Sequence, residues 1–202
     1  MQYSYLALGD SYTIGESVLL SESFPYQTVQ LLRSENALAI LSPEIIAKTG
    51  WTTDELSAQI DQTVFLKRYD IVSLLIGVNN QYRERTAENF LPEFESLLQR
   101  AIAFSGNQPS RVFVLSIPDW GRTPFAEGRD REKISAEIDA YNKICTVTAS
   151  RYGCHFIDIT TAQRKDNDDP DFVAADKLHP SKMEYEKWAR ELQKFIFEAV
   201  GS

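Results

Sequence analysis

The 202-residue chain has the length of one ordinary domain and a globular composition, with 43% hydrophobic and 25% charged residues. Its formal net charge of −8 repels phosphate backbones and anionic lipid headgroups, so nucleic acid is not an expected partner. The sequence contains no run of about 18 apolar residues, so it predicts no membrane-spanning helix. We therefore expect residues 1–202 to form a single domain; the composition leaves the oligomeric state open.

The N-terminal residues lack the basic segment and the long apolar run of a signal peptide. We expect a cytoplasmic protein if Met1 is the natural start, with a removed leader as the alternative. The two cysteines, Cys145 and Cys154, are too few for a disulfide framework, and their spacing is not that of a zinc site. We expect both to be small buried hydrophobic side chains.

Five short apolar segments are predicted to be strands, at residues 3–9, 44–48, 70–77, 111–117 and 153–158. Two of them, 70–77 and 111–117, are almost continuously apolar, as in parallel strands covered on both faces. Helical patterns lie between and after them, at residues 24–36, 53–66, 86–105, 129–151 and 181–199. This alternation predicts an α/β fold, a three-layer α/β/α sandwich with a five-stranded parallel sheet.

The last predicted helix carries large side chains at helical spacing, which we interpret as core packing: Tyr185, Trp188, Leu192 and Phe195. Ser181 is placed to cap its N-terminus. The stretch 164–171, rich in Asp and Asn, is predicted to be an acidic surface loop. Counted from Asp166, a calcium loop would need Gly and Glu where the chain has Asp171 and Leu178, so no metal is expected.

The candidate nucleophile is Ser11, which follows the first predicted strand directly after Gly9 and Asp10. Open α/β sheets bind ligands at the carboxyl ends of their strands, which is where Ser11 is expected. A serine hydroxyl is a poor nucleophile until a neighbouring base removes its proton. The segment is not the Gly-x-Ser-x-Gly elbow of α/β-hydrolases, and Ser11 alone would fit a helix cap equally well. The base must therefore be identified independently.

Of the two histidines, His179 is the candidate base. His155 lies within an apolar strand and is interpreted as a structural, hydrogen-bonded side chain. His179 lies in a polar turn, three residues after Asp176. An aspartate at that spacing can accept the Nδ1 proton, which leaves Nε2 free to act as base. We therefore predict that Ser11, His179 and Asp176 act together; a chance pairing in a surface turn is the alternative.

Acyl transfer also needs hydrogen-bond donors for the oxyanion that develops on the substrate. Gly50 follows the second predicted strand, where its backbone N–H can approach a substrate closely. Asn79 follows the third, and its side-chain amide can donate. Gly and Asn are common in loops, so neither residue is specific alone. Together with Ser11 they follow strands that should be neighbours in one sheet.

These motifs, in this order, resemble those of the SGNH (GDSL-type) hydrolase superfamily. Its Gly-Asp-Ser block matches residues 9–11, and its second-block glycine is similar to Gly50. Its Gly-x-Asn-Asp and Asp-x-x-His blocks are similar to residues 77–80 and 176–179. Asn80 stands where the family usually has Asp, at a position outside the four catalytic residues. The blocks span nearly the whole chain, and four ordered motifs are far more specific than one.

The resemblance implies a flavodoxin-like fold and a serine ester hydrolase that forms an acyl-enzyme on Ser11 and needs no cofactor. It also implies an oxyanion hole made by the backbone N–H groups of Ser11 and Gly50 and the side chain of Asn79. Asp10 is interpreted as structural. Carboxylesterases, lysophospholipases, thioesterases and carbohydrate acetylesterases all occur in this family, so the ester remains open.

Four aromatic residues near predicted strand ends are candidates for the wall of a small apolar substrate pocket: Tyr12, Trp51, Tyr82 and Trp120. Packing between helix and sheet is the alternative for them. A small pocket without a lid favours short acyl or acetyl esters. The main rival function is a flavodoxin-like module in which the loop after the first strand binds phosphate or flavin. That rival leaves the Asp176–His179 pair without a role. A second rival, an inactive ligand-binding descendant of the hydrolases, is disfavoured because all the motif residues are present: Ser11, Gly50, Asn79, Asp176 and His179.

Overall fold

The computed structural model describes residues 2–166 and 169–201 and contains one five-stranded parallel sheet in the order β2-β1-β3-β4-β5. The strands are β1 (Tyr5–Asp10), β2 (Glu44–Lys48), β3 (Ile71–Leu75), β4 (Val112–Leu115) and β5 (His155–Ile157). All five predicted strands and the predicted fold class are therefore confirmed. Several strands are shorter than the apolar segments that predicted them.

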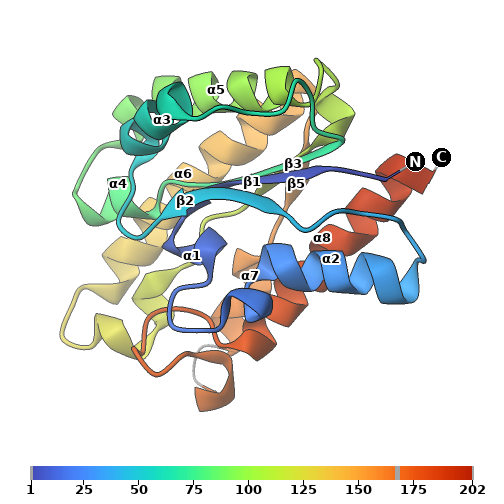
Figure 1. The fold of residues 1–202 in the computed structure, drawn as a ribbon. Helices are drawn as coiled ribbons and strands as arrows, with labels where there is room; N and C mark the ends of the chain where they lie inside the picture. The colour runs from blue at the N-terminus through green and yellow to red at the C-terminus, as the bar shows by residue number, and fades with distance from the viewer. Residues whose placement is uncertain (1, 167–168, 202) are drawn as a thin grey trace.

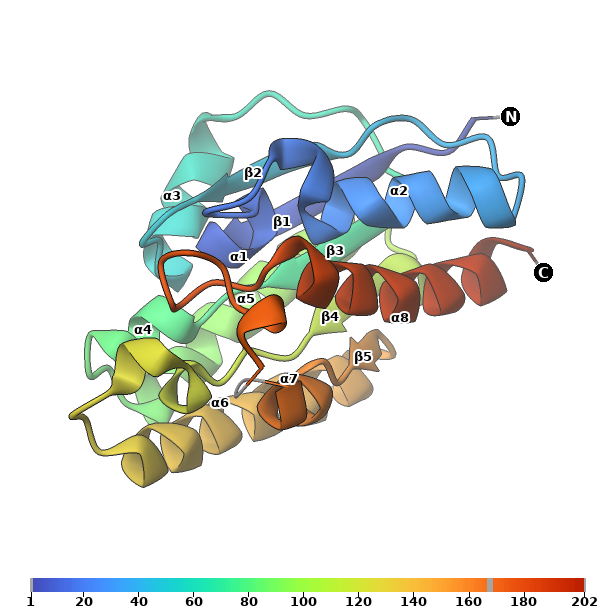
Figure 2. The same cartoon turned by 90° about the horizontal axis from the view of Figure 1, so that it is seen from below.

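The five predicted helices are also present, as α2 (Phe24–Glu35), α3 (Thr53–Gln62), α5 (Ala87–Phe104), α6 (Arg131–Tyr152) and α8 (Lys182–Gly201). Helices α3, α5 and α6 cover one face of the sheet, and α2 and α8 lie side by side on the other (Figures 1 and 2). Right-handed crossovers explain this division. The chain moves from β1 to β2 in one direction and then steps back across the sheet, which changes the face that the connecting helices cover.

The order of the strands creates a topological switch point beside β1. Its neighbours are β2 and β3, and Gly9 near its end is paired with Ala47 on one side and Leu75 on the other. The three strands therefore end at almost the same level. Open α/β sheets bind ligands in the crevice beyond such a point. This edge of the sheet lies at the opposite end of the molecule from both termini (Figure 1).

Three short helices escaped the sequence pattern: α1 (Ser11–Ile14), α4 (Val78–Tyr82) and α7 (Thr160–Asp166). Helical periodicity is recognised over windows of 11–18 residues, which is longer than any of them. Helix α7 also corrects the predicted loop at 164–171, because Arg164 to Asp166 are helical and Pro170–Phe172 form a 3-10 turn. Residues 167 and 168 of that stretch lie outside the described residues. The Arg164 guanidinium fixes the helix by binding the buried carboxylate of Asp119, with Nε and Oδ2 2.8 Å apart.

The core confirms most predictions about single side chains. Tyr185, Trp188 and Leu192 are buried, while Phe195 is half-buried against the same core. The Ser181 hydroxyl accepts a hydrogen bond from the Met183 N–H at 3.2 Å, at the start of α8.

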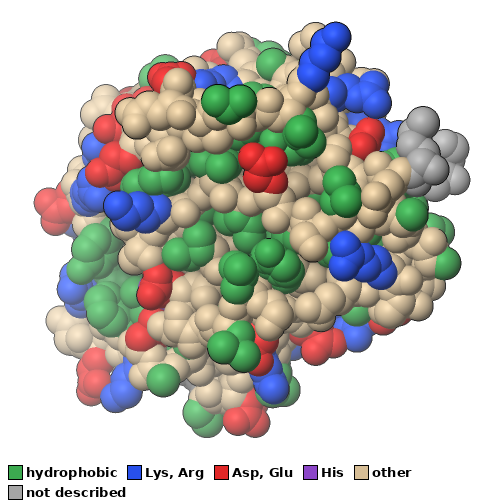
Figure 3. Space-filling view, viewed as in Figure 1, with side chains coloured by type: hydrophobic (Ala, Val, Ile, Leu, Met, Phe, Trp, Pro, Cys, Tyr) green, Lys and Arg blue, Asp and Glu red, His purple; other side chains and the backbone are tan. Residues whose placement is uncertain are grey.

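Both cysteines are free thiols. Cys145 is buried and Cys154 half-buried, which suits packing roles. Among the described residues, no helix combines the length and the apolar character that crossing a membrane requires. Lys and Arg side chains lie interspersed with Asp and Glu on the face drawn in Figure 3.

Candidate active site

Ser11, His179 and Asp176 form a continuous hydrogen-bonded row. Ser11 is the first residue of α1, and its Oγ lies 3.0 Å from His179 Nε2. On the other side of the ring, His179 Nδ1 lies 2.6 Å from Asp176 Oδ2. The serine and the imidazole are both buried, whereas the carboxylate side chain is 32% exposed. The row has the geometry in which a base takes a proton from a serine hydroxyl.

The protonation of the row follows from the surroundings of Asp176. Burial raises the pKa of this carboxyl, but hydrogen bonds from Ser17, His179 and the backbone outweigh burial and lower the pKa to about 2. The carboxylate is therefore ionised at neutral pH and accepts the Nδ1 proton of the imidazole. Nε2 is then the unprotonated nitrogen, and it faces the Ser11 hydroxyl.

Asp10 has a structural position, as the sequence suggested. It is fully buried, and its Oδ1 accepts a hydrogen bond from the Tyr12 N–H at 3.1 Å, which caps α1. Its other carboxylate oxygen has no hydrogen-bond partner among the described residues. Burial raises the pKa of Asp10 to about 7. Asp10 thus fixes the turn that presents Ser11, and it does so at an electrostatic cost above that pH.

The loop that carries Gly50 is tied to both neighbouring loops. The Thr49 hydroxyl donates a hydrogen bond to the carboxylate of Glu16, and Arg83 Nη2 donates to the Gly50 carbonyl at 2.7 Å. Gly50 has a φ of +85°, a left-handed conformation that favours glycine. These contacts fix the Gly50 peptide beside the crevice into which Ser11 faces.

Asn79 and Asn80 have separate roles in the structure. Asn79 lies beside the cavity, and its Nδ2 donates one hydrogen bond to the Trp51 carbonyl at 3.0 Å. An amide nitrogen carries two protons, so one N–H remains for a substrate. Asn80, at the position that departs from the family pattern, is buried and bound to Thr53 by both its amide groups. It anchors the start of α3.

A cavity of about 220 Å³ opens beside the Ser11–His179 pair. Ser11, Gly50, Asn79 and His179 supply polar groups to its wall. Three of the four aromatic residues predicted for the pocket line it: Tyr12, Tyr82 and Trp120. The fourth, Trp51, does not. It follows the turn at Gly50, and its side chain packs against the core as a half-buried residue.

Sequence reasoning missed several residues of this region: Thr49, Val78, Phe125 and Leu178 line the cavity, and Ser17, Glu16 and Arg83 support its loops. Phe125 is the largest omission. Its ring lies 6.1 Å from that of Trp120, and its N–H donates to the Lys177 carbonyl beside His179. An aromatic side chain in a loop was the available signal, but the sequence does not say which loops meet.

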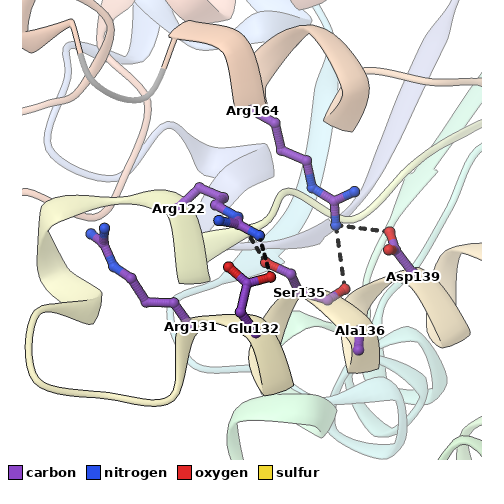
Figure 4. A pocket seen from close by; sticks show the side chains of 7 residues that line it. All are labelled: Arg122, Arg131, Glu132, Ser135, Ala136, Asp139 and Arg164. Atoms are coloured by element: carbon purple, nitrogen blue, oxygen red, sulfur yellow. Dashed lines mark hydrogen bonds and ion pairs between the residues drawn. The ribbon is translucent and has the colours of Figure 1, made fainter.

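Larger clefts lie elsewhere on the surface, and Figure 4 shows one of about 490 Å³. Two of its three arginines are paired with acidic groups, because Arg122 binds Glu132 and Arg164 binds Asp139, each at 2.8 Å. The third, Arg131, donates to the Thr123 carbonyl at 2.7 Å. Arg164 also holds the buried Asp119, the residue before Trp120. The residues that line this cleft include no histidine to activate a nucleophile. Through Asp119, Arg164 supports the loop in which Trp120 forms part of the cavity wall.

His155 lies outside the candidate site, in agreement with its structural interpretation. Its Nε2 lies 3.1 Å from the Ser110 carbonyl oxygen, and its ring stacks on Phe113. No group of three or more His, Cys, Asp or Glu side chains in the described ranges is arranged to hold a metal ion.

A model of the GDSL-like Lipase/Acylhydrolase family matches residues 7–187, which include most of β1, the other four strands and every residue of the candidate site. The chain belongs to this family. This GDSL-family protein is a serine hydrolase that acts on ester bonds.

Relatives of the GDSL-family chain agree with this assignment. An acetylxylan esterase from Geobacillus stearothermophilus is 24% identical over 209 residues, covering 98% of this chain and 87% of the relative. A crystal structure of that enzyme has a TM-score of 0.76 at 20% identity, covering 96% of this chain and 94% of the other. The lipase/acylhydrolase from Enterococcus faecalis has a TM-score of 0.75 at 19% identity, covering 97% and 95%. The two structures show that the GDSL-family fold is shared.

Proposed function

We propose that this chain hydrolyses carboxylic esters with short acyl groups, above all acetyl esters, through an acyl-enzyme on Ser11. The observation that carries the proposal is the 3.0 Å separation between Ser11 Oγ and His179 Nε2 at the edge of a small cavity with four aromatic side chains in its wall. The same row supplies each proton transfer that the reaction needs.

In the first half of the proposed reaction, His179 Nε2 takes the Ser11 proton while Oγ attacks the ester carbonyl carbon. The carbonyl oxygen becomes an oxyanion, which the backbone N–H groups of Ser11 and Gly50 and the amide of Asn79 stabilise. The tetrahedral intermediate then collapses: the bond to the leaving oxygen breaks, and His179 returns the proton to the alcohol. Ser11 remains acylated.

In the second half, water replaces the alcohol. His179 accepts one proton of the water while its oxygen attacks the acyl carbon, and the oxyanion forms at the same place. Collapse breaks the bond to Ser11 Oγ, which regains its proton from His179. Throughout both halves, Asp176 stays ionised and stabilises the imidazolium. The row begins and ends each cycle in the same protonation state.

The preference for short acyl groups rests on the size of the cavity. Its volume of about 220 Å³ is below the range of roughly 300–1,000 Å³ in pockets for drug-sized ligands. Each added methylene gains about 0.8 kcal/mol only while it meets apolar wall. The similarity to an acetylxylan esterase supports acetyl as the acyl group of the natural substrate.

A panel of p-nitrophenyl esters from C2 to C10, with acetylated sugars and acyl-CoA alongside, tests this proposal. We expect kcat/KM to peak between acetyl and butyryl and to fall by C8. Acetylated sugars should be better substrates than acyl-CoA. A profile that climbs through C10 would contradict the short-acyl proposal and favour a lysophospholipase or thioesterase.

Three further proposals concern the whole chain. We propose that residues 1–202 act as one domain, supported by the single sheet with helices on both faces. The net charge of −8 and the mixed surface charges support the expectation that nucleic acid is not a partner. A cytoplasmic location stays a prediction, to be tested by fractionation of the source cells.

A further inference from the structure

The loop after α1 returns to the far end of the Ser11–His179–Asp176 row. Ser17 lies six residues after Ser11, and its hydroxyl donates a hydrogen bond to Asp176 Oδ2 at 2.6 Å. This oxygen is the one that also accepts the proton of His179 Nδ1. The segment from Ser11 to Ser17 therefore supplies the serine at one end of the row and hydrogen-bonds the carboxylate at the other end.

Ser17 completes the hydrogen bonding of this carboxylate. The two oxygens of a carboxylate offer about four acceptor sites. Oδ1 accepts from the backbone N–H groups of Leu178 and His179, each at 2.9 Å, and Oδ2 accepts from His179 Nδ1 and Ser17. Three of these four donors belong to the turn 176–179 itself. Ser17 is the donor that comes from elsewhere in the chain, so it orients the carboxylate relative to the segment of Ser11.

The backbone at Ser17 is in an uncommon conformation. Its φ is +67°, in the left-handed region that residues other than Gly, Asn and Asp seldom adopt. The turn is held by backbone hydrogen bonds from the Gly15 and Glu16 N–H groups to the Ser11 carbonyl. The side chain is exposed apart from its hydrogen bond, and it is not part of the cavity wall. Its hydroxyl is thus directed at Asp176 rather than at a substrate.

We propose that Ser17 is a positioning residue, which holds the Asp176 carboxylate in the orientation and the ionised state that His179 requires. The proposal rests on the proposed function, because it assigns Ser17 a role in the same row. Its effect reaches the reaction through Asp176 and His179, so it should change kcat and leave substrate binding nearly unaltered.

The groups around Asp176 determine how the loss of Ser17 would alter the pH dependence. Among the hydrogen bonds that lower the Asp176 pKa, the one from Ser17 has the largest effect. His179 contacts the carboxylate directly, and Tyr12 and Tyr185 lie near enough for its charge to raise their pKa values. The Glu16 carboxylate adds a further negative charge near Tyr185. Without the Ser17 donor, Asp176 should gain a proton at a higher pH than in the wild type.

Three substitutions of Ser17 distinguish the effect of its hydroxyl from the effect of its backbone conformation. Gly and Asn both tolerate the left-handed conformation, so S17G removes the donor while S17N retains an amide N–H that can reach the carboxylate. S17D has almost the shape of S17N but places a negative charge against Asp176. We expect S17G to lower kcat about tenfold with little change in KM.

The comparison of S17N with S17D tests whether a donor to the Asp176 carboxylate is what matters at this position. S17N should recover most of the wild-type kcat, and S17D should be at least as impaired as S17G, while all three variants melt within a few degrees of the wild type. A wild-type kcat in S17G would overturn the proposal, as would equal kcat values in S17N and S17D. Wild-type enzyme that lacks esterase activity would instead refute the proposed function, so the two failures are distinguishable.

Discussion

The two N–H groups of the Asn79 side-chain amide have different partners. One N–H holds the Trp51 carbonyl, which fastens the Gly50 loop to the start of α4. The other is the N–H that we propose donates to the oxyanion. Neighbouring Asn80 uses its amide to hold Thr53 and has no place on the cavity wall. Two adjacent asparagines are thus expected to differ sharply when they are replaced.

Replacement of Asn79 by alanine should lower kcat by a factor on the order of 10², with little change in KM, because an oxyanion donor acts mainly in the transition state. Steady-state kinetics on p-nitrophenyl acetate measures both constants. N80A is the matched control: it should lower the melting temperature more than N79A and lower kcat per folded molecule less. Equal activity of N79A and the wild type would show that Asn79 does not face the oxyanion.

At the same scale, the sequence predicts the residues that lie in short local motifs. Asp176 and His179 share one turn, so their contact needs only three residues of chain, and Ser11 is marked by its place after a strand. The role of Ser17 depends on a contact with a residue 159 positions away. No pattern in the sequence indicates that the two loops meet, so such supporting residues are found only in the structure.

At the scale of the elements, the N-terminus of α1 should make the stability depend on pH near neutrality. Its cap, Asp10, has its pKa raised by burial to about 7, whereas an aspartate in an unfolded chain titrates near 4. Between these values the native state keeps a proton that the unfolded state releases. The free energy of unfolding contributed by this group therefore falls as the pH rises from about 4 to about 7, and then levels off.

Replacement of Asp10 by asparagine preserves an acceptor for the Tyr12 N–H and removes the ionisation. Relative to the wild type, D10N should gain stability from pH 5 to about pH 7 and keep that gain at pH 8, as measured by urea midpoints at each pH. Asp176 does not interfere, because its lowered pKa of about 2 affects stability only as the pH falls below about 4. Parallel curves for the two proteins would mean that Asp10 does not titrate in this window.

Length decided which elements the sequence could predict. The five long helices are long enough for a helical period to be recognised, and the five strands lie in short apolar runs. Helices α1, α4 and α7, with four, five and seven residues, do not. Two of these short helices begin at the candidate site. Ser11 is the first residue of α1, and Asn79 is the second residue of α4. The elements nearest the chemistry were therefore the hardest to predict.

In the whole molecule, the sheet order explains why distant segments form one site. The loops after β1, β2 and β3 meet because these strands are neighbours at the switch point, and the turn before α8 reaches the same end of the sheet (Figure 2). Alternation of strands and helices predicted one parallel sheet but left the order of its strands open. The sequence indicated only that the strands before Ser11, Gly50 and Asn79 should be neighbours. The full order is seen in the structure, where tertiary packing such as that of α2 on α8 accompanies it.

The central claim is that Ser11 is the nucleophile, and covalent labelling tests it most directly. A serine-directed phosphonate should add once per chain, and peptide mass spectrometry should place the adduct on Ser11. The S11A variant should remain folded and take no label, and H179A should react far more slowly than the wild type, because the base is missing. An adduct on any other serine, including Ser17, or undiminished labelling of S11A, would contradict the account.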